Sequence, residues 1–124
     1  MSLEVDTSAS PSPCSVSADW QDSTVIIRCA GVLDMLTSPQ LEREIATALG
    51  KQPTSLIVDL TEVDFLASCG MSALIACHDE CTPKVRFTVV ADGPATSRPM
   101  ELIGLTSIID VRPTLEAAMA EKVA

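Results

Sequence analysis

The chain has 124 residues, a formal net charge of −9 and 47% hydrophobic residues, which fits one globular domain with a single core. One Trp, two Phe and no Tyr leave almost no aromatic surface on which single-stranded nucleic acid could stack. The negative charge repels phosphate backbones and anionic lipids, so we expect neither nucleic acid nor a membrane among its partners. The acidic start, Met1–Asp6, lacks the features of a signal peptide, and we expect a cytoplasmic protein.

The N-terminal part of the chain divides into a tail and a hairpin. The first 13 residues are rich in Ser and Pro, which predicts a flexible tail, so the folded domain is expected to span residues 14–124. A weak strand pattern at 14–20 and a strong one at 24–30 flank turn-forming residues and predict a β-hairpin. The segment 31–34 is expected to leave the second strand.

A helix is predicted after the hairpin. Leu41, Ile45 and Leu49 are spaced by four residues and give this helix one buried face. Ser38 is the expected N-cap, because its hydroxyl can accept a hydrogen bond from a backbone N–H and a Pro follows it at the first helical position. Gly50 marks the expected end of the helix.

Strands and helices alternate along the rest of the chain, which predicts parallel strands joined by helices. The expected order is β-β-α-β-α-β-α-β-α, an α/β fold with a mixed, largely parallel sheet of about five strands and four helices in a single domain. The elements after the first helix are expected at 55–60 (a buried strand), 61–64 (a turn), 68–82 (a helix), 85–91 (a strand), 97–103 (a short helix), 107–111 (a short strand) and from 113 onward (a last helix).

The junction between the strand at 55–60 and the next helix carries the most informative side chains. Ser68, Cys69 and Gly70 stand where the chain turns and enters the helix. The first N–H groups of a helix have no partner within it and the helix dipole is positive there, so a phosphate on Ser68 would be stabilised locally. Ser68 could also be a plain helix N-cap, and the two roles are compatible. The junction therefore predicts a modifiable surface switch rather than a substrate pocket.

Three local sequences carry a resemblance to a known family. They are Gly31-Val32-Leu33-Asp34, then Val58-Asp59-Leu60 with Val63-Asp64-Phe65-Leu66, and Ala67-Ser68-Cys69-Gly70-Met71. In this order and at these places, they resemble the motifs of a STAS domain of the bacterial anti-sigma factor antagonist family, over about residues 14–120. Ala67 stands where the family usually has Asp, and Cys69 replaces its second Ser or Thr.

The resemblance implies a regulatory protein with no enzymatic activity, cofactor or metal of its own. In the family, the Ser at the position of Ser68 is phosphorylated by a partner anti-sigma factor, a serine kinase of the GHKL type. The unphosphorylated antagonist binds the anti-sigma factor and thereby frees a sigma factor, and a phosphatase resets the phosphorylated form. By position, the residues expected to bind the partner are Gly31, Asp34, Asp64, Ser68, Cys69, Gly70 and Met71.

Asp34 and Asp64 also admit an interpretation as a general acid and base. No His, Lys or second nucleophile is placed to complete such a site, so both are expected to accept hydrogen bonds from loop N–H groups, with Asp34 also at the partner surface. His78 lies ten residues after Ser68, roughly 15 Å along a helix, which excludes a Ser–His pair within that helix.

The five cysteines are odd in number and are expected to be reduced thiols. Cys77 and Cys81 lie four residues apart, which is not a familiar zinc spacing, so at least one is expected to fill the core. Cys69 lies near a helix N-terminus, where the thiolate is favoured. A redox role for Cys69, Cys77 and Cys81 stays open, and with it a small thiol-dependent redox or phosphotransfer enzyme built on Cys69. The other alternative is a STAS module that serves a different complex, such as a transporter or a lipid-trafficking complex.

Overall fold

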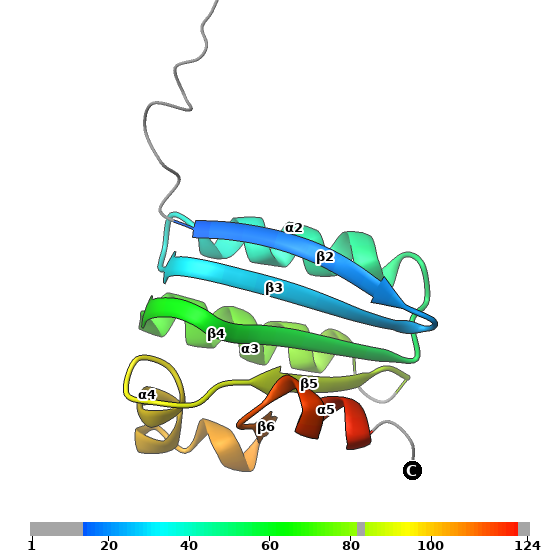
Figure 1. Ribbon diagram of the computed structural model, residues 1–124. Coiled ribbons are helices and arrows are strands. Elements are labelled where there is room, and N and C mark those ends of the chain that lie inside the picture. The colour runs from blue at the N-terminus through cyan, green and yellow to red at the C-terminus, as the bar shows by residue number, and fades with distance from the viewer. Residues whose placement is uncertain (1–13, 82–83, 122–124) are drawn as a thin grey trace, which may run out of the picture.

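The computed structural model describes residues 14–81 and 84–121, which form a five-stranded sheet between layers of helices (Figure 1). The first two strands are antiparallel and all later neighbours are parallel, as predicted. The predicted tail at 1–13 lies outside the described residues. In the sheet the strands follow the order of the chain: β2 (Cys14–Gln21), β3 (Thr24–Leu33), β4 (Ser55–Leu66), β5 (Arg86–Val90) and β6 (Asp110–Arg112).

The predicted helices are present, and they cover both faces of the sheet. The first two lie side by side on one face and the last lies on the other (Figure 1). No helix in the described part of the chain is long and apolar enough to cross a membrane. The bounds are α2 (Ser38–Leu49), α3 (Ser68–Cys81), α4 (Ser97–Leu102) and α5 (Leu115–Glu121), with a short 3-10 helix, η1 (Leu105–Ser107), between α4 and β6.

The first helix packs as its spacing predicts, but its cap differs. Leu41 and Ile45 are fully buried and Leu49 packs partly buried against the same core. Thr37 holds the cap position, so the assignment of Ser38 as N-cap is wrong. The Ser38 hydroxyl is the donor in a 2.6 Å hydrogen bond to the carbonyl of Asp34, which points it back into the preceding turn.

The predicted turn at 61–64 is wrong, because β4 continues through it to Leu66. Strand β3 also continues past the predicted exit at 31–34, as far as Leu33, and the two strands stay paired through two register shifts. Gly31 lies at one shift with a φ of +96°, a conformation that suits glycine. As a result Leu33 and Leu66 are partners in register, and the loops that follow β3 and β4 begin side by side.

The short strand predicted at 107–111 begins later, at Asp110. Gly104, with a φ of +78°, ends the α4 segment, and η1 occupies the residues that follow. The Ser107 hydroxyl donates to the Gly104 carbonyl at 2.7 Å, which keeps this segment in a turn instead of an extended strand.

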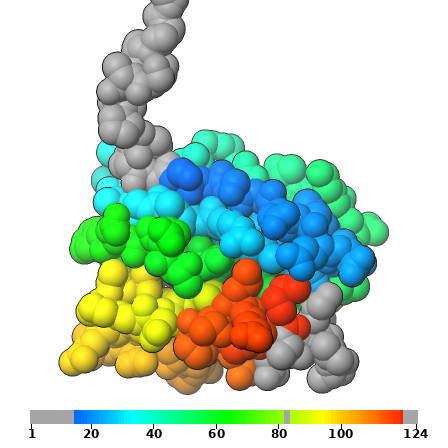
Figure 2. Space-filling view, in the orientation of Figure 1, coloured from blue at the N-terminus to red at the C-terminus, as the bar shows by residue number. Residues whose placement is uncertain are grey.

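One face of the sheet is only partly covered by a helix. Figure 2 shows β2, β3 and β4 open to the viewer, with α5 lying across the lower strands. Beneath α5, Ile26 and Ile57 pack with Ala118 in a small second core. On β3, the Arg28 guanidinium lies 3.5 Å from the Asp19 carboxylate of β2 and 3.4 Å from the Asp59 carboxylate of β4. The Arg28–Asp19 pair is exposed and adds little stability, whereas the Asp59 side chain is only 8% exposed.

Candidate functional site

Two loops meet at the carboxyl ends of β3 and β4 and form what we call the strand-end site, residues 34–37 and 67–69. The N–H of Ala67 donates to the carbonyl of Leu33 at 3.0 Å, which ties the two loops together. Gly70 lets α3 begin directly on these strand ends. A Cβ atom on Gly70 would lie 2.9 Å from Leu66 Cδ1 and 3.0 Å from the Leu33 carbonyl oxygen.

Ser68 is the first residue of α3 and is exposed. The carbonyl of the preceding residue, Ala67, accepts the N–H of Met71 at 3.1 Å, so Ala67 occupies the cap position and the interpretation of Ser68 as N-cap is wrong. The Ser68 hydroxyl makes no hydrogen bond to any residue in the described ranges. It is presented to solvent at the positive end of a 14-residue helix.

Asp34 builds a rigid turn beside Ser68. Its Oδ1 accepts the N–H groups of Leu36 at 2.9 Å and Thr37 at 3.2 Å. The Thr37 hydroxyl accepts the N–H of Asp34 at 2.8 Å and donates to the carbonyl of Val32 at 2.8 Å. The turn role predicted for Asp34 is thus confirmed, whereas Asp64 lies exposed within β4 and does not form a turn.

The residues expected to bind the partner differ in exposure. Ser68 and Cys69 are exposed, and Asp34 is partly buried. Gly70 is buried and Met71 is only 7% exposed, packed in the main core. Gly70 and Met71 therefore fix the position of the helix start, whereas Ser68, Cys69 and Asp34 are accessible to a partner.

Two exposed side chains of the strand-end site are not among the partner-binding residues predicted from the sequence. Met35 is 70% exposed and Leu36 is 81% exposed, both within the turn that Asp34 holds. The signal was available: the two apolar residues lie between the end of a strand and a helix cap, where they belong to the buried face of neither element.

The cysteines separate into one exposed thiol and a buried set. Cys69 is exposed, whereas Cys29, Cys77 and Cys81 are buried. Burial, followed by the charges of Glu80, Cys81 and Glu42, raises the pKa of Cys77 to about 12. Burial and Glu80 raise the pKa of Cys81 to about 11. The core-filling role predicted for at least one of the pair is confirmed for both.

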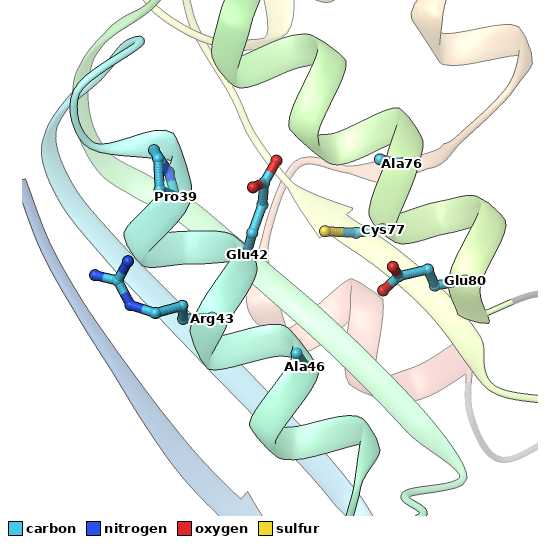
Figure 3. A pocket seen from close by; sticks show the side chains of 7 residues that line it. All are labelled: Pro39, Glu42, Arg43, Ala46, Ala76, Cys77 and Glu80. Atoms are coloured by element: carbon cyan, nitrogen blue, oxygen red, sulfur yellow. The ribbon is translucent and has the colours of Figure 1, made fainter.

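The Cys77 thiol borders a hollow between α2 and α3 with a volume of about 430 Å³ (Figure 3). Glu42 and Glu80 lie on opposite sides of this hollow. Because burial and these carboxylates raise its pKa, the Cys77 thiol is protonated at neutral pH and is a poor nucleophile. The residues that line it are Pro39, Glu42, Arg43, Ala46, Ala76, Cys77 and Glu80.

We expect a large spread in alkylation rates among these thiols. In native buffer near neutral pH, Cys69 should react first, since it is accessible, while Cys77 and Cys81 should stay unlabelled because they are both buried and protonated. In denaturant all of them should label. Timed alkylation with peptide mapping measures this, and native labelling of Cys77 as fast as that of Cys69 would contradict the packing of α3.

With this geometry in place, three comparisons assign the family. The STAS domain model matches residues 15–118. The chain belongs to the STAS domain family of anti-sigma factor antagonists. This STAS domain is 32% identical, over 111 residues, to anti-sigma-F factor antagonist RsfB of Mycobacterium tuberculosis, an alignment that covers 90% of this chain and 91% of RsfB.

Solved structures agree on the fold. The STAS domain superposes on the crystal structure of an anti-sigma factor antagonist from Mycobacterium paratuberculosis with a TM-score of 0.83 and 34% identity, over 87% of this chain and 92% of that one. It also shares its fold with the Bacillus cell fate determinant SpoIIAA in its phosphorylated form, at a TM-score of 0.64 and 21% identity, over 89% and 100% of the two chains.

Proposed function

We propose that this protein is an anti-sigma factor antagonist whose binding is gated by phosphorylation of Ser68. The unphosphorylated form binds an anti-sigma factor through the strand-end site and so frees a sigma factor. The anti-sigma factor is itself a serine kinase of the GHKL type that phosphorylates Ser68, and a phosphatase restores the free form. The single observation that carries this proposal is the exposed Ser68 hydroxyl, which is without a hydrogen bond in the described chain, at the start of α3.

The relatives support the kind of partner. RsfB, 32% identical along nearly its whole length, is named an anti-sigma-F factor antagonist, and so is RsfA of the same organism, 28% identical over 102 residues. SpoIIAA, which shares the fold, has a structure in a phosphorylated form, so this fold accepts the modification in that protein.

Electrostatics explain how a phosphate could act as a gate. It adds about −1.5 to −2 charges at pH 7. At the start of α3 the helix dipole and free N–H groups stabilise that charge within the protein. Asp34, on the neighbouring loop of the strand-end site, already contributes a negative charge there. A partner face that fits the unmodified surface would then meet added negative charge, and its docking would weaken.

Cys69 stands at a position where the family usually has a hydroxyl residue, and Ala67 at one where it has Asp. Against the alternative of a thiol enzyme built on Cys69, the other two cysteines considered for a redox role, Cys77 and Cys81, are buried and have pKa values raised to about 12 and about 11.

The proposal predicts that the unmodified protein displaces a sigma factor. When it is added to a preformed complex of an anti-sigma factor and a fluorescently labelled sigma factor from its own organism, the anisotropy of the label should fall to the value of free sigma factor. An anisotropy that stays constant at saturating excess, with each anti-sigma factor of that organism, would contradict the proposal.

A further inference from the structure

We propose that Met35 and Leu36 form an apolar anchor that supplies much of the affinity for the partner, while Ser68 supplies the switch. This inference rests on the proposed function and adds to it the chemistry of the partner face. That face must hold an apolar recess for the two side chains, next to the position that receives the Ser68 hydroxyl.

The anchor is fixed before binding. In the turn that carries it, the Asp34 carboxylate accepts the N–H groups of Leu36 and Thr37. The Thr37 hydroxyl accepts the N–H of Asp34 and donates to the carbonyl of Val32. The Ser38 hydroxyl adds a further bond to the Asp34 carbonyl. A side chain on such a turn loses little backbone freedom when a partner covers it, and preorganised groups of this kind give the most affinity for their area.

The exposure of Met35 and Leu36 to water is unfavourable, and a partner that covers both side chains removes that cost. Leu36, at 81%, is the most exposed of the large apolar side chains in the described ranges, and its neighbour Met35 is 70% exposed. Single exposed apolar residues are ordinary. Met35 and Leu36 are consecutive and lie in the strand-end site, which distinguishes them from the exposed pair Leu102 and Ile103 at the end of α4. Buried apolar anchors encircled by polar contacts are the common source of binding energy in interfaces.

The position of the anchor and the charge beside it indicate which protein covers it. The anchor is continuous with the Ser68 loop, because Ala67 donates its N–H to Leu33, the residue just before Asp34. A partner that reaches Ser68 therefore covers the turn as well. The Asp34 carboxylate, which is bonded to the N–H of Leu36, favours a partner recess with a basic group at its rim. We therefore assign the anchor to the same anti-sigma factor and not to a second protein.

The test makes the same substitution at two similarly exposed leucines. Leu36→Ser removes half of the anchor, and Leu102→Ser makes the same change on α4, where Leu102 is 76% exposed and follows β5 instead of β3. Calorimetric titration with the anti-sigma factor should show a loss of affinity of about ten- to hundredfold for Leu36→Ser. Leu102→Ser should bind within about twofold of wild type, and both variants should melt at the wild-type temperature because both side chains are exposed.

A kinetic measurement separates docking from the switch. For phosphorylation by the anti-sigma factor, Leu36→Ser should raise KM and leave kcat nearly unchanged, because the anchor does not touch the hydroxyl. If wild type binds and Leu36→Ser binds equally well, the anchor is wrong while the proposed function stands. Equal losses in both leucine variants would also overturn the anchor. If wild type fails to bind any anti-sigma factor of its organism, the proposed function is wrong and the anchor fails with it.

Discussion

Replacement of Ser68 by Glu should weaken binding to the anti-sigma factor by tenfold or more, a loss of about 1.4 kcal/mol or greater. The substitution places a permanent negative charge at an exposed helix start beside Asp34, where a docked partner would exclude water and strengthen the repulsion. Ser68→Ala should bind as wild type does, since it adds no charge, but should accept no phosphate. Isothermal titration calorimetry on the three proteins measures the difference.

A matched control for added charge is available on α2. Thr47→Glu adds the same charge at another exposed helix position, near the end of α2 that is remote from the strand-end site. It should leave affinity within about twofold of wild type. If Thr47→Glu weakens binding as much as Ser68→Glu, the effect belongs to net charge, and the gate at Ser68 is refuted.

Gly70→Ala should destabilise the fold and weaken partner binding together. The new Cβ would lie 2.9–3.0 Å from Leu66 Cδ1 and the Leu33 carbonyl oxygen, so α3 must move off the strand ends. Overpacking of this kind costs about 1–3 kcal/mol. The better helix propensity of Ala offsets up to about 1 kcal/mol of that. A net loss of about 1–2 kcal/mol should appear in urea unfolding, and the displaced Ser68 loop should bind less well.

Gly50→Ala separates this steric effect from helix propensity. Gly50 has a φ of −63°, and a Cβ there would meet its nearest atom, the Thr47 carbonyl oxygen, at an ordinary 3.4 Å. Its unfolding free energy should stay the same or rise slightly. A Gly70→Ala protein as stable as Gly50→Ala would mean that α3 does not press on the strand ends as described.

The order of strands and helices along the chain, and the place of Ser68 at the start of a helix, could be predicted because both depend on local patterns. The alternation of strands and helices, with Ser68 placed just after a buried strand, is readable from apolar spacing and from the turn residues. The cap of α2 was misjudged by one residue because Thr37 and Ser38 are both good cap residues. Both hydroxyls bond to Asp34 in the preceding turn, and the Thr37 hydroxyl makes no capping hydrogen bond, so the preference of a hydroxyl residue for the cap does not distinguish the two positions.

The extent of β4 and the cap residue of α3 could not be predicted, because both depend on the pairing of β4 with β3. The residues 61–64 are polar and turn-like in sequence, yet pairing with an extended β3 keeps them in a strand across two register shifts. That extra length brings Leu66 level with Leu33 and fixes where α3 can start. It therefore places Ala67, and not Ser68, at the cap. Strand pairing over long sequence separations decides such details.

The central claim, that a phosphate on Ser68 switches off sigma release, is tested most directly by one protein sample before and after treatment with its kinase and ATP. Mass spectrometry should find one phosphate, on Ser68, and the sample should release labelled sigma factor from the anti-sigma factor before treatment but not after it. Equal release by the two forms, or a phosphate on another residue with Ser68 unmodified, would contradict the account.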